Sequence, residues 1–396
     1  MKPLAGLRIA DFTVHAAGPF CTHMLSQLGA ECIKIESALR PDIFRKPHAV
    51  YGRMGPASFD QVASNKLSIR LNLKDRRGVE LAKRLVAVSD VACESFRPGV
   101  MDRLGLGWKD LSAIRPNLVM TSVSSSGQTG PDAHFAGYAP LFGAWGALGW
   151  LTGYVDGPPV EMRHVMDHSV GMNAAMATLA AVQHLRRTGE GGHVDVSARE
   201  VAASLNGEAM LLAAAGGEPH RLGNEHPRMA PHGVYHSRDR DRWLTIAVHS
   251  DAAWQAFARV IGRPDLAADP RFRSEADRHA RRDVLDVEIE RWAATRDADA
   301  AAAELQAAGV AAHVSATIHD VVHDGHLRER GMVIDVDDLE GNRRAALSVP
   351  VRFSRSQTGL DRGTPRLGED EDHVFGELLG LGKAERDALV DAQVIY

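Results

Sequence analysis

The group best placed to do chemistry is a single carboxylate, Asp167, between a Gly-Pro-Pro turn and a long helical pattern. From 169 to 186 apolar residues recur with helical spacing, so Asp167 stands where a helix N-cap belongs. Capping alone would explain an aspartate there. A helix N-terminus also keeps a carboxylate ionised, and an ionised carboxylate can attack an activated acyl group. Both interpretations stay open, and the small neighbours Ser169 and Gly171 leave space for a substrate.

The same stretch has a second possible chemistry. In His164-Val165-Met166-Asp167-His168 two histidines four residues apart would share one face of a helix. With an acidic residue between them they resemble a zinc-hydrolase motif, HxxEH, with aspartate in place of glutamate. The shorter acid and the cation of Arg163 beside the would-be metal both disfavour zinc. We therefore expect no metal site, and the zinc hydrolase is a weaker alternative.

Cations stand at the ends of two predicted strands. Ser95-Phe96-Arg97-Pro98-Gly99 combines a strand end with a Pro-Gly turn, and Arg103 follows it. Guanidinium groups match phosphate oxygens bidentately and a helix start adds N–H donors, so this segment indicates a phosphate site; solvated loop charges are the alternative. Lys74, at the end of a predicted edge strand, is a candidate anion contact.

The elements that must position these residues form an α/β pattern. Predicted helices, such as 20–28 and 76–88, alternate with predicted strands at 7–12, 31–36, 67–73, 91–96 and 118–123. This alternation predicts a large Rossmann-like domain with a doubly wound parallel sheet. Ligands of such sheets bind after the strands, here in the loops 14–17, 95–99 and 124–131. The first loop lacks GxGxxG and the chain has no Walker-type motif, so no nicotinamide dinucleotide is predicted.

The remaining chain predicts a smaller α+β domain joined to the first by long linkers. Its strands are expected at 243–248 and 310–314, around helices at 252–261, 282–294 and 298–308. The predicted division is a large domain of 1–215 and 332–396, a linker 216–231, a small domain 232–316 and a return linker 317–331. In the large domain we further expect a helix from 198 to about 215, strands at 332–336 and 347–353, and a last helix at 383–392.

Composition sets the broad class. A chain of 396 residues with 44% hydrophobic and 24% charged residues fits a soluble protein of two domains. The net charge of −5 gives no reason to expect nucleic-acid binding, and three cysteines do not make a disulfide framework. No signal peptide is evident, and the longest uncharged apolar run, 139–151, is too short to span a bilayer. We therefore expect a cytoplasmic protein without membrane contact.

A set of short segments, taken in order, carries a resemblance over nearly the whole chain. The segments are 2–9, 17–19, 28–36, 65–68, 96–99, 103–105, 127–131, 151–153, 157–159, 167–171, 187–191, 269–272, 308–310 and 367–369. Together they resemble the class III CoA-transferases. That group includes formyl-CoA:oxalate and carnitine CoA-transferases and is related to the 2-methylacyl-CoA racemases.

The resemblance implies an enzyme that moves CoA from an acyl-CoA, such as succinyl-CoA, to a small carboxylic acid. Asp167 would be the catalytic aspartate, forming first a mixed anhydride and then an aspartyl-CoA thioester. Coenzyme A is thus a substrate, and no tightly bound cofactor is implied. Phe96 would lie against the adenine or pantetheine, and Lys74, Arg97 and Arg103 near the phosphates. The implied CoA contacts are His15, Ala16, Ala17, Leu71, Asn72, Leu73, Lys74, Ser95, Phe96, Arg97, Arg103, and Phe135 to Tyr138.

Several positions depart from the formyl-CoA enzyme. That enzyme has a glutamine where Ala16 stands and an acid where Ala139 stands. Its early CoA-contacting arginine corresponds to Ser37, so Arg40 or Arg45 would have to replace it. Its Gly-rich lid has no equivalent near 223–231. Together these differences argue against oxalate or formate as a substrate.

Three further expectations follow from the resemblance. The racemases have a histidine, half of their acid/base pair, where Tyr138 stands, so racemisation is a weaker alternative, as is a non-catalytic CoA-binding module. The transferases form interlocked homodimers in which long linkers pass around the partner, and 216–231 and 317–331 fit such linkers. His15, Arg163, His164 and His168 are candidate contacts for a second carboxylate of the substrate, with ordinary surface polar residues as the alternative.

Overall fold

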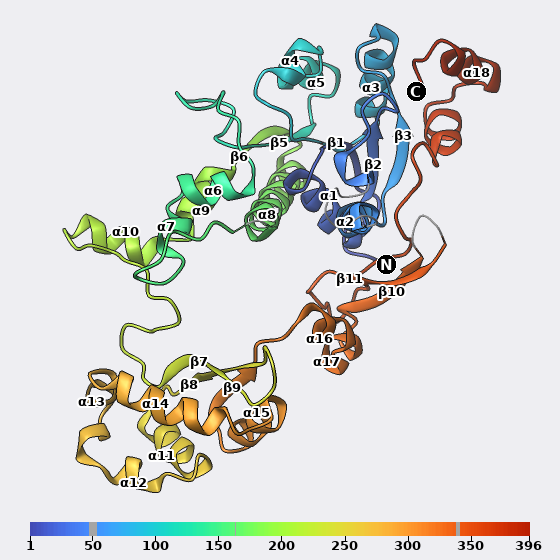
Figure 1. Cartoon of the computed structure of the whole chain (residues 1–396). Coiled ribbons are helices and arrows are strands. Elements are labelled where there is room, and N and C mark those ends of the chain that lie inside the picture. The colour runs from blue at the N-terminus through green and yellow to red at the C-terminus, as the bar shows by residue number, and fades with distance from the viewer. Residues whose placement is uncertain (47–53, 163, 338–340) are drawn as a thin grey trace. The chain divides into compact units, whose positions relative to one another are not determined.

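The computed structural model describes residues 1–46, 54–162, 164–337 and 341–396. Arg163, a candidate substrate contact, lies outside the described residues. The chain divides into two compact units (Figure 1). Unit 1 comprises Met1–Gly149, Glu161–Gly216 and Gly325–Tyr396, and unit 2 comprises Trp150–Val160 and Gly217–Asp324. The short segment Trp150–Val160 therefore belongs to a different unit from the helix that carries Asp167.

Unit 1 is built on a six-stranded parallel sheet. Its strands are β1 (Arg8–Phe12), β2 (Glu31–Glu36), β3 (Leu67–Arg70), β4 (Val91–Glu94), β5 (Val119–Ser124) and β6 (Gly192–Ser197). Their spatial order is β3-β2-β1-β4-β5-β6, and each neighbouring pair is parallel. The predicted α/β parallel sheet is confirmed. The chain reverses its direction of travel between β1 and β4, so the loops after these two strands flank the crevice where such sheets bind ligands.

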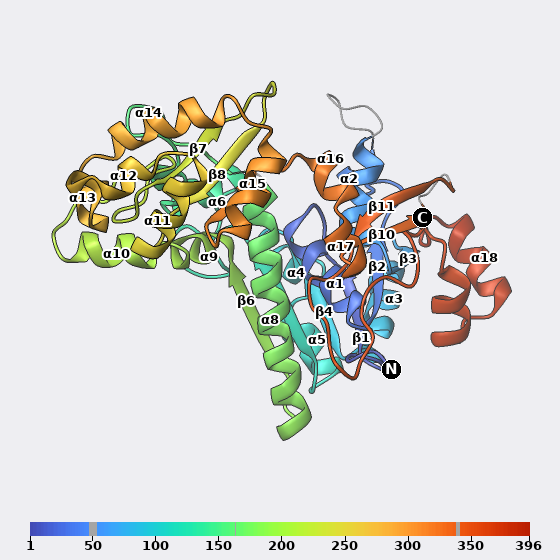
Figure 2. The same ribbon diagram turned by 90° about the horizontal axis from the view of Figure 1, so that it is seen from below.

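Successive strand residues point to opposite sides of the sheet, and apolar residues lie on both sides. Ile9, Cys32 and Cys93 belong to the core that lies under α1 (Ala17–Gln27) and α8 (His164–Thr188). Ala10 and Ile33 belong to the opposite core, which is covered by α3 (Arg76–Ala87), α5 (Trp108–Ile114), the π-helical segment η3 (Asp372–Leu378) and the C-terminal residues. The long helix α8 packs against α1, β5 and β6 (Figure 2).

The remaining elements of unit 1 include two that differ from the sequence prediction. The expected helix from 198 to about 215 is broken in two, because the Asn206 side chain donates to the carbonyls of Ala202 and Gly146. The last strand is 343–347, not 347–353, because it pairs antiparallel with 333–337 in a hairpin. The remaining elements that lie wholly in unit 1 are η1 (Ile43–Arg45), α2 (Met54–Ala63), α4 (Val100–Arg103), α6 (Ala139–Trp145), α9 (Ala198–Ser204), α10 (Gly207–Ala214), α17 (Gly325–Glu329), β10 (Val333–Asp337), β11 (Arg343–Leu347) and α18 (Lys383–Asp391). The short helix α7 (Leu148–Leu151) begins in unit 1 and ends in unit 2.

Unit 2 is a three-stranded antiparallel sheet with helices packed on it. The strand order is β7 (His232–His236), β8 (Trp243–Ala247), β9 (Ala311–Val314), and β7 was not predicted from the sequence. Its core is centred on Trp254 and Phe257. The buried guanidinium of Arg278 donates to Ala230 O at 3.1 Å and to Asp251 at 2.9 Å, which ties the entering chain to the helices. Those helices are α11 (Asp251–Val260), α12 (Pro264–Ala268), η2 (Pro270–Phe272), α13 (Glu275–His279), α14 (Arg282–Ala293), α15 (Ala298–Ala307) and α16 (Ile318–His323).

The last segment between the two units and the character of the helices complete the description. The expected return linker, 317–331, carries the short helices α16 and α17. Within the described part of the chain, no helix combines the length and the apolar character that crossing a membrane requires.

Candidate active site

Asp167 lies in the first turn of α8 rather than at its cap. The helix begins at His164, three residues earlier, so the N-cap prediction is wrong. The side chain is half-buried, and burial raises the pKa of its carboxyl from 3.8 to about 6. It forms no hydrogen bond or ion pair with any described residue. The shift is opposite in direction to the effect expected of a helix N-terminus alone.

This environment suits a nucleophile better than a structural carboxylate. With a pKa of about 6, roughly nine-tenths of the group is ionised at pH 7. A carboxylate of higher pKa is more basic and has more to gain from forming a covalent bond. Because no described donor occupies its lone pairs, both oxygens stay available to a substrate.

The beginning of α8 packs against the beginning of α1. Gly171 makes this close approach possible, because a Cβ there would lie 2.7 Å from Ala17 O. The ring of His168 meets the ring of Phe20 edge to face at 4.3 Å. His168 Nδ1 lies 2.7 Å from His164 O; since a carbonyl can only accept, Nδ1 carries the proton and Nε2 remains available. The turn that carries Asp167 is therefore held next to the first predicted CoA loop.

The first loop follows β1 at the reversal point of the sheet. His15 adopts a left-handed backbone conformation, with φ of 66°. Its ring meets that of Tyr138 edge to face at 6.2 Å, so two segments predicted to contact CoA lie together. Tyr138 is 64% exposed and Phe135 43% exposed, which leaves an apolar surface that a ligand would cover.

The loop after β4 is joined to the loop after β1. Ser95 Oγ accepts from Val14 N at 2.9 Å and donates to Val14 O at 3.1 Å. Gly18 is required beside this contact, because a Cβ there would lie 2.8 Å from the Cβ atoms of Ser95 and Thr13. Phe96 is oriented by its main-chain N–H, which donates to Glu94 at 2.8 Å. Burial raises the pKa of the Glu94 carboxyl to about 7.

The three cations predicted to meet phosphates are exposed. Lys74, Arg97 and Arg103 form no ion pair with any residue in the described ranges. Lys74 belongs to the segment after β3, two strands from β1, where Asn72 bonds the main-chain oxygens of Gln393 and Val394. Exposed cations without carboxylate partners are suited to a polyphosphate ligand.

The two arginines proposed to replace the family arginine at Ser37 differ in availability. Arg45 is committed elsewhere: its guanidinium forms an ion pair with Glu36 at 2.7 Å and lies 4.1 Å from the ring of Phe59. Arg40 is exposed and remains the candidate.

The zinc-hydrolase alternative requires a set of metal ligands around His164 and His168. Over the ranges the structure describes, no three His, Cys, Asp or Glu side chains gather as ligands of one metal ion would. His168 instead bonds the main chain of His164 and packs on Phe20.

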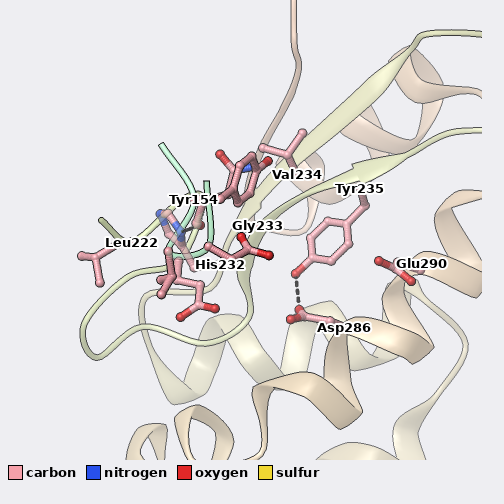
Figure 3. Close-up of a pocket in the computed structure, with 12 residues that line it drawn as sticks. Tyr154, Leu222, His232, Gly233, Val234, Tyr235, Asp286 and Glu290 are labelled. Atoms are coloured by element: carbon pink, nitrogen blue, oxygen red, sulfur yellow. Dashed lines mark hydrogen bonds between the residues drawn. The ribbon is translucent and has the colours of Figure 1, made fainter. Parts of the chain in front are cut away.

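Unit 2 contains a concave pocket that sequence reasoning missed (Figure 3). It has a volume of about 280 Å³, and its lining includes Tyr154, His232, Asp286 and Glu290. The Tyr235 hydroxyl donates to Asp286 at 2.7 Å. Its walls come from four separate segments that share no motif, so the sequence contains no local signal for it. The predicted site residues all lie in unit 1, apart from Arg163, whose position is not described.

Comparison with known proteins agrees with the resemblance noted in the sequence. The family described as CoA-transferase family III matches residues 4–371. A succinyl-CoA–D-citramalate CoA-transferase of Chloroflexus aurantiacus is 33% identical over 100% of this chain and 98% of its own length. An acetyl-CoA:oxalate CoA-transferase of Acetobacter aceti is 39% identical over 73% of this chain and 74% of its own. The crystal structure of a CAIB/BAIF family protein from Brucella suis superposes with a TM-score of 0.85, at 31% identity, over 95% of this chain and 99% of that one.

Proposed function

The chain belongs to CoA-transferase family III and is a CoA-transferase, and we propose that it moves CoA from an acyl-CoA to a small carboxylic acid through Asp167. The observation that carries this proposal is a half-buried carboxylate with a pKa of about 6 and no described partner. It stands where α8 meets the loop at the reversal point of the parallel sheet. That crevice is the usual ligand site of such a sheet.

The proposed reaction keeps the acyl group activated at every step. An Asp167 oxygen attacks the thioester carbonyl, the C–S bond breaks, and CoA leaves as a thiolate while a mixed anhydride forms. The thiolate attacks the aspartyl carbonyl and releases the first acid as a carboxylate, leaving an aspartyl-CoA thioester. An acceptor carboxylate then attacks that thioester, and the released thiolate takes the new acyl group, which regenerates Asp167. Water must be kept out, because hydrolysis would lose the activation.

Succinyl-CoA is the donor we propose, with a small organic acid as acceptor. A relative named for succinyl-CoA and D-citramalate supports a substrate that bears a second carboxylate. His168 Nε2 and the exposed edge of His15 are the groups we propose to meet that carboxylate, with His164 and Arg163 as further candidates. A relative is also named for oxalate, so oxalate belongs among the acceptors tested even though Ala16 and Ala139 argue against it.

Coenzyme A would lie across the loops after β1 and β4. In this arrangement Phe96 packs against the adenine or pantetheine, and Tyr138 covers the pantetheine arm. Lys74, Arg97 and Arg103 take the phosphates. The proposal is supported by the hydrogen bonds that join the loops of Val14 and Ser95, and by the three unpaired cations.

A homodimer is proposed as the working form, with 216–231 and 317–331 as the linkers. Helix α10 has no buried residue, and its Met210, Leu211 and Leu212 are 58%, 74% and 49% exposed. On α8, Met172 and Met176 are also exposed. A second copy of the chain covering these apolar side chains would remove them from water.

A trapping experiment tests the covalent step. Incubation with succinyl-CoA and hydroxylamine should convert Asp167 to a hydroxamate that peptide mass spectrometry locates, and Asp167→Asn should remain unmodified. An Asp167→Ala enzyme with full transferase activity would end the proposal. Mono- and dicarboxylic acids, including oxalate, should then be screened as acceptors with succinyl-CoA and acetyl-CoA. Deuterium uptake at the α-carbon of a 2-methylacyl-CoA without any acceptor would instead support a racemase.

A further inference from the structure

Four charged side chains lie fully inside unit 1, directly below the first loop. Asp11, Lys34 and Lys66 are 0% exposed and Asp42 is 3% exposed. Burial by itself would lower the pKa of Lys34, but the carboxylates of Asp42, Glu36 and Asp11 raise it above its usual value. Apolar side chains of the same volume would serve stability equally well in many proteins, so buried ion pairs call for another explanation.

One of the two ion pairs is bonded to the main chain of the loop. Asp42 Oδ2 lies 3.3 Å from Lys34 Nζ and accepts from the main-chain N–H of His15 at 3.2 Å. Lys34 Nζ also donates to Thr13 O at 2.9 Å. The pair therefore forms hydrogen bonds with the loop on both sides of Val14. The main-chain N–H and carbonyl of Val14 are themselves hydrogen-bonded to Ser95.

The other pair lies mainly beside α1. Lys66 Nζ contacts Asp11 of β1 at 2.9 Å and donates to Pro19 O at 2.9 Å and Thr22 Oγ1 at 2.7 Å, both on α1. This pair reaches the loop only through Asp11 Oδ1, which accepts from Thr13 N at 2.9 Å. Of the two lysines, only Lys34 bonds the loop of 13–15. The Lys34–Asp42 pair thus bonds the loop at both Thr13 O and His15 N, whereas the Asp11–Lys66 pair bonds it only at Thr13.

The loop depends on such support for two reasons. His15 has a φ of 66°, a conformation that residues other than glycine adopt only when their surroundings hold them there. The next two residues, Ala16 and Ala17, have no polar side chain, so any polar contact they make with a ligand comes from their main chain. The direction of those main-chain groups is set by the conformation of the loop.

We propose that Lys34 and Asp42 are positioning residues for coenzyme A, which hold the main chain of 13–15 in the conformation that CoA binds. The inference rests on the proposed function, because it assumes that this loop contacts CoA. Neither side chain touches the ligand. Both act from inside the protein, through Thr13 O and His15 N.

The test compares Asp42→Ala, Asp42→Asn and Lys34→Met with a control at the opposite end of the sheet. Arg115→Met breaks an ion pair with Asp90 of 2.8 Å, next to the first residues of β4 and β5 and away from the loop. The dissociation constant for free CoA is measured by calorimetry. Asp42→Ala and Lys34→Met should weaken CoA binding about tenfold or more, since each removes a hydrogen bond from a charged group. Asp42→Asn keeps an oxygen for His15 N and should lose less affinity than Asp42→Ala.

Two readouts separate positioning from mere stability. The kcat/KM for the acyl-CoA should fall in the Asp42 variants while kcat/KM for the acceptor acid changes little, because CoA is already covalently held in the second half-reaction. Amide hydrogen exchange of peptides that cover 13–16 should become faster in Asp42→Asn and should stay unchanged in Arg115→Met. Melting curves show which variants are folded. If Asp42→Ala does not fold, Asp42→Asn is compared with the wild type in its place.

The outcomes are distinguishable from a failure of the proposed function. A wild-type protein that binds no CoA would refute the proposed function itself. If the wild type binds CoA and the folded Asp42→Ala and Asp42→Asn variants bind it with the affinity of the wild type, the positioning proposal alone is overturned. Equal losses of affinity in Arg115→Met and Asp42→Ala would also overturn it.

Discussion

Replacing Asp167 by asparagine should abolish transferase activity and at the same time stabilise the protein at neutral pH. The carboxyl is half-buried and has no described partner, so the folded state holds a charge that is worse solvated than in the unfolded chain. Asparagine has nearly the same shape and no charge. A nucleophile that is needed for activity is expected to lower the stability of the folded protein when its site is shaped for the substrate.

The size of the effect follows from the pKa of Asp167. Burial raises it from 3.8 to about 6, and at about 1.4 kcal/mol for each pH unit the charged form costs at most about 3 kcal/mol. Contact with water reduces this, so we expect Asp167→Asn to gain about 1–3 kcal/mol at pH 7. Between pH 3.8 and 6 the folded wild type binds more protons than the unfolded chain, so its stability falls as the pH rises. The gain of the variant should therefore be complete above pH 7 and vanish near pH 3.

The assay is urea unfolding of wild type and Asp167→Asn at pH values from 4 to 8. Other carboxyl groups are common to both proteins, so their titration cancels in the difference. In the wild type, kcat/KM for the acyl-CoA should also fall as the pH drops through about 6, because protonation removes the carboxylate that we propose as the nucleophile. A stability gain that is independent of pH would contradict this reasoning. So would a loss of about 0.5–2 kcal/mol in Asp167→Ala, which is the behaviour of a helix cap.

Three further predictions concern the ligand loops and the dimer. We expect the wild type to bind CoA more tightly than dephospho-CoA, which lacks the 3′-phosphate. Among Lys74→Ala, Arg97→Ala and Arg103→Ala, the variant that has lost the contact to this phosphate should bind both compounds equally. If all three variants keep the preference for CoA, none of these cations contacts the 3′-phosphate. Gly18→Ala should weaken CoA binding at least tenfold, because its Cβ would lie 2.8 Å from Ser95 and Thr13. The control Gly192→Ala should bind CoA normally, because no atom lies within 4 Å of its Cβ. Equal CoA affinities of the two variants would refute the role of the close packing at Gly18. Leu211→Glu on α10 should yield monomers in sedimentation velocity, because a glutamate at this position, where Leu211 is 74% exposed in the chain, would place a charge in the proposed dimer interface. A variant that remains dimeric would remove α10 from the proposed interface.

The sheet of unit 1 was predictable because its strands are buried on both faces. Runs such as Cys32-Ile33 and Val91-Ala92 are apolar at successive positions, and helical segments separate them, which indicates a parallel sheet. The strands β7 and β11 gave weaker signals. Each belongs to an antiparallel hairpin whose register is set by its partner, and β7 begins with His232 and Gly233. Their existence depends on pairing that local composition does not encode.

The candidate site shows the same limit more sharply. The sequence suggested Asp167 and the loops at the strand ends as candidates, from the family resemblance and from the alternation of strands and helices. It did not identify that α8 begins at His164, because no capping residue marks that end in the sequence. The sequence also indicated no role for Lys34, in the predicted strand 31–36, or for Lys66, just before the predicted strand 67–73. Whether such a lysine meets water or a buried carboxylate is decided by residues distant in the chain, here Asp42 and Asp11.

Lys34 nevertheless carries a signal that local reasoning can use. It stands between Ile33 and Ile35 in β2, the strand next to β1, and both faces of this sheet are covered. An interior strand between two covered faces gives a lysine no route to water, so its ammonium must find a carboxylate or carbonyl inside the protein. Acceptors of that kind lie at the strand ends, where the main chain leaves the sheet and ligands bind. A lysine predicted inside such a strand therefore predicts a supported ligand loop above it, and Thr13 O is the acceptor that it finds here.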